Sequence, residues 1–313
     1  MQTKEVRFSG LKSQKGVGLL YFFRKYRNSR TLKEVKKRKV LKLEKDYPVS
    51  LPNLDEINHT NKNVIDSLNY AGNIQQALSP KEKHLLYLFD SAFILNKPKD
   101  IVSGDFYWFT KIQGKIIVFL ADCSGHGIPA AFMSILGTSL LSHIVHEENN
   151  CNPALILQRL DYKIKKAFDQ NELNEELSSE GMDAVVCTID YENNVIYYSG
   201  AQRPLYLSQN GEVNVFNGCK HMVGGFLENE KRFENKVIPF NEGDHMYMFT
   251  DGYHDQLGEV TGRKYMASNF KNYISEIQSL PMLEQKSLLL KNLESWKGNN
   301  TQSDDVLIMG ITL

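Results

Sequence analysis

The chain has 313 residues, of which 42% are hydrophobic and 24% are charged, a composition typical of globular proteins rather than fibrous or disordered ones. Its formal net charge is zero, so we expect no nucleic-acid partner for the molecule as a whole. The four cysteines lie far apart and form no Cys-x-x-Cys pair, which argues against a disulfide scaffold or a zinc ribbon. No apolar run approaches the roughly 18 residues of a membrane span, so we expect a soluble cytoplasmic protein.

The neutral total hides a basic N-terminus. Residues 1–50 contain 15 lysines and arginines but only four acidic residues. We expect residues 1–53 to form a basic, flexible arm. The apolar patch Leu19–Phe23 precedes most of the charges. This order favours weak association with an anionic membrane, which would make the protein peripheral to the membrane, over binding to nucleic acid.

Residues 54–78 have the spacing of a helix that ends at Ser79-Pro80. Its 3–4 spacing resembles an imperfect heptad seam, with apolar positions at Ile57, Val64, Leu68, Ala71 and Leu78 and polar ones at Asn61 and Gln75. Two interpretations stay open. The helix packs on its own domain, or residues 54–80 form a linker that dimerises or carries a signal to a domain at 85–313.

Short strands and hairpin turns follow from about residue 90. The turns Gln113-Gly114 and Asn210-Gly211 predict hairpins between 106–112 and 115–121 and between 205–209 and 212–216. Further strands are expected at 184–191, 195–199, 245–250 and 306–312, and helices at about 129–146, 153–169, 263–277 and 282–296. Hairpins with helices grouped between them indicate an α+β fold of antiparallel layers.

Two aspartates lie at the open end of the first predicted hairpin. If Gln113-Gly114 is a two-residue turn, the register places Asp105 opposite Asp122, with Cβ atoms about 5 Å apart. Two like charges at that distance destabilise a sheet unless a cation lies between them. The hairpin therefore predicts a site for a divalent metal.

The C-terminal strands repeat this pattern. Asp251 directly follows the strand 245–250, and Asp304 and Asp305 directly precede the strand 306–312, so antiparallel pairing would bring these carboxylates together. Asp-Gly is a common turn dipeptide, so one such aspartate alone indicates little. Together, these hard oxygen ligands favour Mg²⁺ or Mn²⁺ over zinc.

Two further residues have open roles. His126, in the loop after Asp122, is either a surface histidine or a proton donor near the metal site. Asp183 begins a predicted strand and is either a residue that supports the metal ligands or simply the first residue of that strand.

From about residue 90 onward the chain resembles the SpoIIE/RsbU-type branch of the metal-dependent protein phosphatases, the protein phosphatase 2C superfamily. The resemblance rests on five ordered motifs, namely Ser103-Gly104-Asp105-Phe106-Tyr107, Ala121-Asp122-Cys123-Ser124-Gly125-His126-Gly127, Ser199-Gly200-Ala201, Phe249-Thr250-Asp251-Gly252 and Gln302-Ser303-Asp304-Asp305. It implies a four-layer α-β-β-α sandwich of two antiparallel sheets flanked by helices, with two Mn²⁺ or Mg²⁺ ions at one edge.

The resemblance also implies roles for individual residues. Asp122 would bridge both metals, the backbone carbonyl of Cys123 would bind one, and Asp251, Asp304 and Asp105 would complete the set. Asp122 and Asp251 would hold the metal-activated water, and Asp305 would support the ligands. Asp183 stands where the family often has threonine, so its part in a third metal site stays open. The chain shows no counterpart of the arginine that binds phosphate in some eukaryotic members.

The expected reaction is hydrolysis of phosphoserine or phosphothreonine on a regulatory protein by a water that two metals activate. The alternatives are a catalytically silent binding module on the same fold and a two-metal hydrolase of small phosphorylated molecules. By analogy with the family, the client would be a phosphorylated anti-sigma-factor antagonist or a similar partner-switching protein. A homodimer through the helix 54–78 is a further expectation.

Overall fold

The structure is a computed structural model that describes residues 54–125, 127–169, 180–225 and 232–313. The basic arm expected at 1–53 and the candidate proton donor His126 lie outside the described residues.

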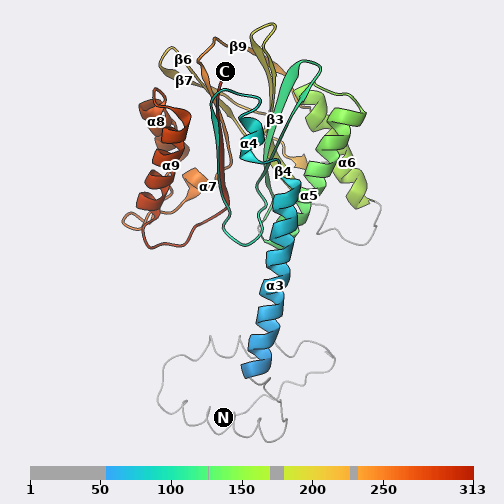
Figure 1. Cartoon of the computed structure of the whole chain (residues 1–313), viewed down its shortest axis with the longest axis vertical. Coiled ribbons are helices and arrows are strands. Elements are labelled where there is room, and N and C mark those ends of the chain that lie inside the picture. Colours follow the sequence, from blue (N-terminus) through green and yellow to red (C-terminus); the bar gives the residue numbers. More distant parts are fainter. Residues whose placement is uncertain (1–53, 126, 170–179, 226–231) are drawn as a thin grey trace, which may run out of the picture. The chain divides into compact units, whose positions relative to one another are not determined.

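Two antiparallel sheets form the centre of the fold (Figure 1). One is five-stranded, in the order β1-β11-β10-β6-β7, and the other is six-stranded, in the order β2-β3-β4-β5-β9 with β8 beside β4. The first comprises β1 Ala92–Lys97, β11 Val306–Thr312, β10 His245–Phe249, β6 Leu205–Gln209 and β7 Glu212–Phe216. The second comprises β2 Phe106–Ile112, β3 Lys115–Cys123, β4 Gly181–Asp190, β5 Val195–Ala201, β9 Lys236–Pro239 and β8 Val223–Gly224.

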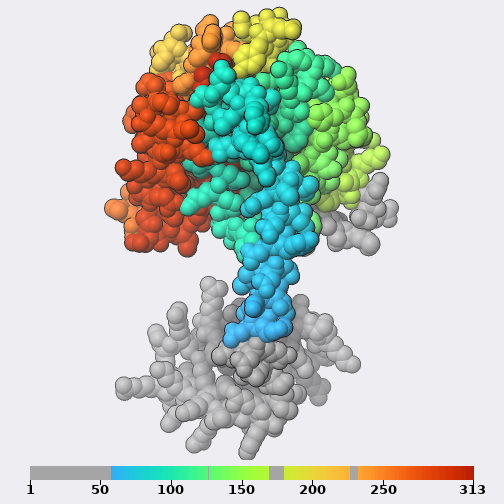
Figure 2. Space-filling model, viewed as in Figure 1, coloured from blue at the N-terminus to red at the C-terminus, as the bar shows by residue number. Residues whose placement is uncertain are grey.

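Helices cover the outer faces of both sheets. On the six-stranded side lie α5 Ile128–Ser142, the π-helical turn η1 His143–Glu147 and α6 Pro153–Asp169, and on the five-stranded side lie α8 Ala267–Ile277 and α9 Met282–Lys297. The space-filling view shows these two helical layers on opposite sides of the sheets, green and orange-red (Figure 2). The other helices among the described residues are α3 Leu54–Leu78, α4 Glu82–Leu85 and α7 Gly252–Asp255.

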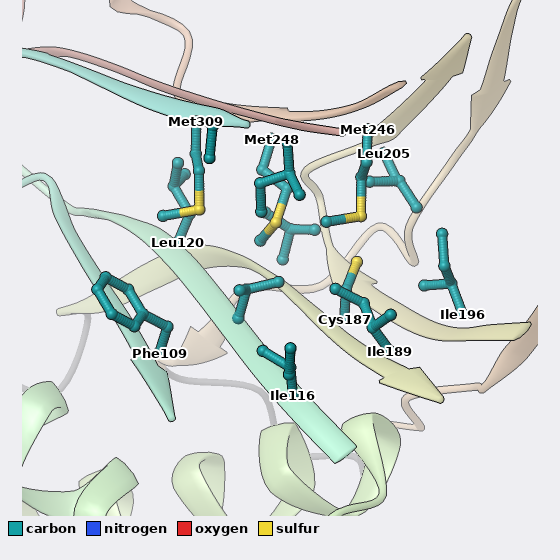
Figure 3. Packing of buried hydrophobic residues seen from close by; sticks show 14 of the residues in the cluster. Phe109, Ile116, Leu120, Cys187, Ile189, Ile196, Leu205, Met246, Met248 and Met309 are labelled. Atoms are coloured by element: carbon teal, nitrogen blue, oxygen red, sulfur yellow. The ribbon is translucent and has the colours of Figure 1, made fainter. Parts of the chain in front are cut away.

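The alternation of side chains along β3 shows why the sheets stack. Ile116, Val118 and Leu120 are buried in the core between the two sheets, whereas Ile117 and Phe119 are buried against the helices. The opposing sheet contributes three methionines to the inner core, and Met246, Met248 and Met309 lie across from Leu120 and Cys187 (Figure 3). The expected α+β sandwich of two antiparallel sheets flanked by helices is confirmed.

The predicted hairpin register is also present. Gln113 and Gly114 both have positive φ, 51° and 74°, as a type I′ hairpin turn requires, and Ile112 pairs with Lys115. Three strands were not predicted. β1 is buried at four successive positions, so it shows no alternation, β9 is a short, mostly exposed edge strand that ends in a proline, and β8 has only two residues.

The last turns of α3 pack on the loop that precedes β2. A Cβ on Gly72 would come within 2.9 Å of the carbonyl oxygen of Ile101. The Gln75 side chain forms an amide pair with the Ser103 backbone, donating to its carbonyl at 2.6 Å and accepting from its N–H at 3.0 Å, and also donates to Ser134. Gln75 therefore holds the last turns of α3 on the domain, and dimerisation through this helix stays a prediction.

One described segment, Ile128–Glu147, is long and apolar enough to cross a membrane by length and composition, contrary to the expectation that no such segment exists. This is weak support for a membrane span, because the core helix of a soluble protein passes the same test. Here Ala130, Met133, Leu141 and Ile144 are buried in the core between the helices and the six-stranded sheet.

Candidate active site

Three aspartates continue the inner faces of β2, β3 and β4 at one edge of the six-stranded sheet. The last residue pair of the β2–β3 hairpin is Phe106 with Ala121, so Asp105 and Asp122 occupy the next position. On the other side of β3, Asp122 pairs directly with Asp183. Because side chains alternate along a strand, these carboxylates follow directly on the apolar residues of the inner core.

The five-stranded sheet brings two more carboxylates to the site. β10 and β11 pair antiparallel, with Phe249 opposite Ile308, so Asp251 follows one strand where Asp304 precedes the other. Gly252 makes this close approach possible, since a Cβ at that position would overlap the carbonyl oxygen of Asp305.

One arginine of the described residues, Arg203, lies among these carboxylates. Nη2 of Arg203 contacts Asp122 at 2.6 Å, Asp251 at 2.7 Å and Asp183 at 3.2 Å, and the Arg203 side chain is only 9% exposed. Arg203 belongs to the loop between β5 and β6, so it comes from outside the predicted aspartate motifs. Sequence reasoning missed it. The available sign was a lone arginine three residues after Gly200 of the Ser199-Gly200-Ala201 motif.

An open cavity of about 270 Å³ lies over this cluster. Its lining includes four carboxylates and the arginine, namely Asp122, Asp183, Asp251, Asp304 and Arg203, together with Cys123, Ser124, Gly125, Gln202 and Met222. Asp183, whose role was open, thus lies beside the three predicted ligands Asp122, Asp251 and Asp304.

The other two predicted aspartates lie behind the cavity rather than in its wall. Asp105 is buried and accepts a 2.6 Å hydrogen bond from Thr250. Asp305 is also buried, and its two carboxylate oxygens accept hydrogen bonds from the backbone N–H groups of Lys99 and Gly104. Asp305 therefore anchors the loop that leads to Asp105.

The site carries more negative charge than the arginine balances. Burial raises the pKa of Asp122 to about 7, and repulsion from Asp251 and Asp304 adds to this effect against the opposing charge of Arg203. Burial also raises the pKa of Asp183 and of Asp304. Burial, with repulsion from Asp122, raises the pKa of Asp105 well above its ordinary value. A further cation at this edge would relieve the repulsion.

The donor chemistry of the cluster suits Mg²⁺ or Mn²⁺. Carboxylate oxygens from three separate elements converge on one cationic nitrogen, and hard oxygen donors are the ligands that these metals prefer. Within the described ranges, however, no three His, Cys, Asp or Glu side chains are arranged so that they could already hold a metal ion. One carboxylate oxygen each of Asp122, Asp183 and Asp251 contacts the guanidinium instead.

Comparison with known proteins agrees with this architecture. Among solved structures, the SiaA-PP2C domain of Pseudomonas aeruginosa is 28% identical, with a TM-score of 0.73 over 81% of this chain and 98% of that chain. The PP2C phosphatase domain of SpoIIE from Bacillus subtilis, solved with a fragment of its regulatory domain, is 16% identical, with a TM-score of 0.57 over 71% and 62% of the two chains. The RsbU and RsbW domains of a Mycobacterium tuberculosis protein are 18% identical, with a TM-score of 0.56 over 71% and 59%.

The last two similarities show the fold alone. No curated protein matches the chain at a significant level. Residues 112–313, more than half of the chain, match the family model described as Stage II sporulation protein E (SpoIIE). The chain therefore belongs to the SpoIIE family, with the fold of protein phosphatase 2C domains.

Proposed function

We propose that the protein is a metal-dependent serine/threonine phosphatase that hydrolyses phosphoserine or phosphothreonine on a regulatory partner protein. The observation that carries the proposal is the convergence of Asp122, Asp183, Asp251 and Asp304 on one open cavity, with more negative charge than Arg203 balances. Membership of the SpoIIE family and similarity to the SiaA-PP2C domain support the phosphatase class.

Two Mn²⁺ or Mg²⁺ ions would be held by Asp122, Asp251 and Asp304, by the backbone carbonyl of Cys123, and by Asp105 directly or through water. When bound, such ions lower the pKa of a water and neutralise the charge of the phosphate. In this proposal Asp122 and Asp251 hold the attacking water.

The surrounding residues position the ligands. Thr250 donates to Asp105 and also hydrogen-bonds Leu307 of β11, so it ties Asp105 to the opposite sheet. Asp305 fixes the loop before Asp105, and Asp183 lies beside Asp122 in the neighbouring strand. His126 is proposed as a proton donor to the leaving group.

The test compares wild type with Asp122→Asn on casein phosphorylated on serine, with and without Mn²⁺. We expect dephosphorylation only with Mn²⁺ and a loss of at least about 10²-fold in the variant, because metals supply several kcal/mol of transition-state stabilisation. The same enzyme is assayed on nucleotides and sugar phosphates. Activity on those alone would identify a small-molecule hydrolase, and no activity on any substrate would identify a silent binding module.

We propose the following division of the chain. Residues 85–313 form the catalytic domain, residues 54–80 a linker helix, and residues 1–53 a basic arm that docks on a partner or an anionic membrane. The client is proposed to be a partner-switching protein such as a phosphorylated anti-sigma-factor antagonist. If the linker helix dimerises, Leu68→Asp should change the oligomeric state measured by light scattering while leaving Mn²⁺ binding intact. Unchanged mass and activity would contradict a role beyond packing.

A further inference from the structure

The positive charge at the centre of the carboxylate cluster belongs to a side chain of this protein, Arg203. One nitrogen, Nη2 of Arg203, contacts three carboxylates that belong to three different elements. Arg203 is more than nine-tenths buried, whereas its three carboxylate partners are 20–32% exposed where they line the open cavity. The guanidinium is therefore the counter-ion that keeps Asp122, Asp183 and Asp251 together in the protein as it stands.

The backbone that presents Arg203 is built for this placement. Its N–H donates to the carbonyl of Ala201 at 2.7 Å, which closes a γ-turn centred on Gln202, and Gln202 has a φ of 61°. A γ-turn with positive φ is rare and strained. Such strain persists only where the surroundings hold it.

Three contacts hold this turn. The Tyr198 hydroxyl donates to the Arg203 carbonyl at 2.8 Å, and the Gln202 side chain donates to Asp183 at 2.8 Å. The Gln202 backbone N–H donates to the carbonyl of Cys219, also at 2.8 Å. Gly200 is required beneath the turn, because a Cβ there would overlap the Arg203 carbonyl. The fold thus directs Arg203 toward the aspartates.

The placement also carries a cost. Nε of Arg203 is buried and has no hydrogen-bond partner among the described residues. A buried N–H without a partner is unfavourable. The cavity that borders Arg203 is open and has a volume of about 270 Å³. A competing cation with higher charge could therefore displace it.

We propose that Arg203 is an internal counter-cation that competes with the divalent metal for Asp122 and Asp251. In the metal-free protein it neutralises part of the cluster, and it withdraws when metal binds. This inference rests on the proposed metal-dependent function. It adds that metal affinity is set by an arginine that is not a ligand, and that the site stays folded without metal.

Mn²⁺ affinity tests the competition without measuring activity. Free Mn²⁺ is measured by electron paramagnetic resonance during titration of wild type, Arg203→Gln and Arg203→Lys. We expect Arg203→Gln to bind Mn²⁺ about 10–100-fold more tightly, because the metal no longer displaces charge-assisted hydrogen bonds. Arg203→Lys, which keeps the charge without the fork of donors, should lie between the two.

The matched control is Arg159→Gln. Arg159 is an exposed residue of α6 that forms an ion pair with Glu148. Its substitution should leave Mn²⁺ affinity unchanged. Thermal unfolding in EDTA supplies the second readout. Arg203→Gln should lower the melting temperature more than Arg159→Gln, since only the first leaves clustered carboxylates unbalanced.

Direct observation of the guanidinium decides between competition and a through-space charge effect. We expect the side-chain ¹⁵N–¹H signal of Arg203, assigned by its absence in Arg203→Gln, to shift on titration with Mg²⁺ to that of a solvent-exposed guanidinium. An Arg203 that keeps its carboxylate hydrogen bonds at saturating Mg²⁺, or an Arg203→Gln variant that binds Mn²⁺ as wild type does, would overturn the proposal. If neither protein binds Mn²⁺, the proposed function itself fails.

Discussion

Neighbouring aspartates Asp304 and Asp305 should respond to mutation in opposite ways. Asp305 is buried and accepts hydrogen bonds from the N–H groups of Lys99 and Gly104 at 2.7 and 2.8 Å. Asp304 lines the open cavity, and its carboxylate accepts a hydrogen bond from the N–H of Asp305, the next residue. We therefore expect Asp305 to stabilise the fold and Asp304 to serve the metal.

The contacts set the size of the effect. Hydrogen bonds to a charged group are worth about 1.5–3 kcal/mol each. Water can replace the carboxylate at Lys99, which is half-buried, but not at Gly104, which is buried. Asp305→Ala also removes a negative charge that repels Asp105, and this offsets part of the lost stability. We expect Asp305→Ala to lower the free energy of unfolding by about 2–3 kcal/mol and Asp304→Ala by less than about 1 kcal/mol.

Urea unfolding in EDTA, followed by circular dichroism, measures both variants without any contribution from metal. Mn²⁺ titration of the same proteins should show the reverse order, with the greater loss of affinity in Asp304→Ala. Equal destabilisation by the two substitutions, or a change below about 0.5 kcal/mol for Asp305→Ala, would refute the assignment of Asp305 as the anchor of the loop.

Three other expectations follow from the site and the linker. Because the pKa of Asp122 is raised to about 7, the folded metal-free protein keeps a proton that the unfolded chain loses near pH 4. The free energy of unfolding in EDTA should therefore fall from about pH 4 to pH 7 and level off above. A free energy of unfolding that rises over this range would contradict the raised pKa of Asp122. Gln75→Ala removes the hydrogen bonds to Ser103 and should lower the free energy of unfolding in urea by about 2–3 kcal/mol. The control Gln76→Ala, at the exposed neighbouring residue, should lower it by less than about 0.5 kcal/mol. Equal values would refute the role of Gln75 in holding the end of α3. His126→Ala should lower turnover by about 10²-fold or more without weakening Mn²⁺ binding, and an unchanged pH–rate profile would exclude a proton donor.

Local patterns were sufficient to predict most of the strands and the hairpin register. Gln113-Gly114 and Asn210-Gly211 adopt positive φ in both turns, as hairpin turns with these residues should. Asp105 and Asp122 follow in register because the turn fixes the pairing of every residue in the hairpin. The hairpin and the strand ends therefore account for the placement of the predicted aspartates.

Tertiary contacts account for what the sequence did not reveal. Arg203 reaches the carboxylates from a loop, through a turn that depends on Gly200 and Tyr198, and no periodicity encodes that arrangement. The register places Asp105 and Asp122 one position beyond the pair Phe106–Ala121, but it does not show that Asp105 accepts a hydrogen bond from Thr250 of the other sheet. Strand β1 was missed because it is buried without alternation.

The most direct test of the proposed function is the Mn²⁺ dependence of phosphoserine hydrolysis by wild type and Asp251→Asn. Asp251 lines the cavity and contacts Arg203. The hydrogen bonds from Thr250 to Asp105 and from Lys99 to Asp305 do not involve the Asp251 carboxylate. We predict phosphate release from phosphoserine casein by wild type only when Mn²⁺ is added, with at least about 10²-fold less in the variant. Phosphate release in EDTA, or equal rates for the two proteins at saturating Mn²⁺, would contradict a metal-dependent phosphatase at this cluster.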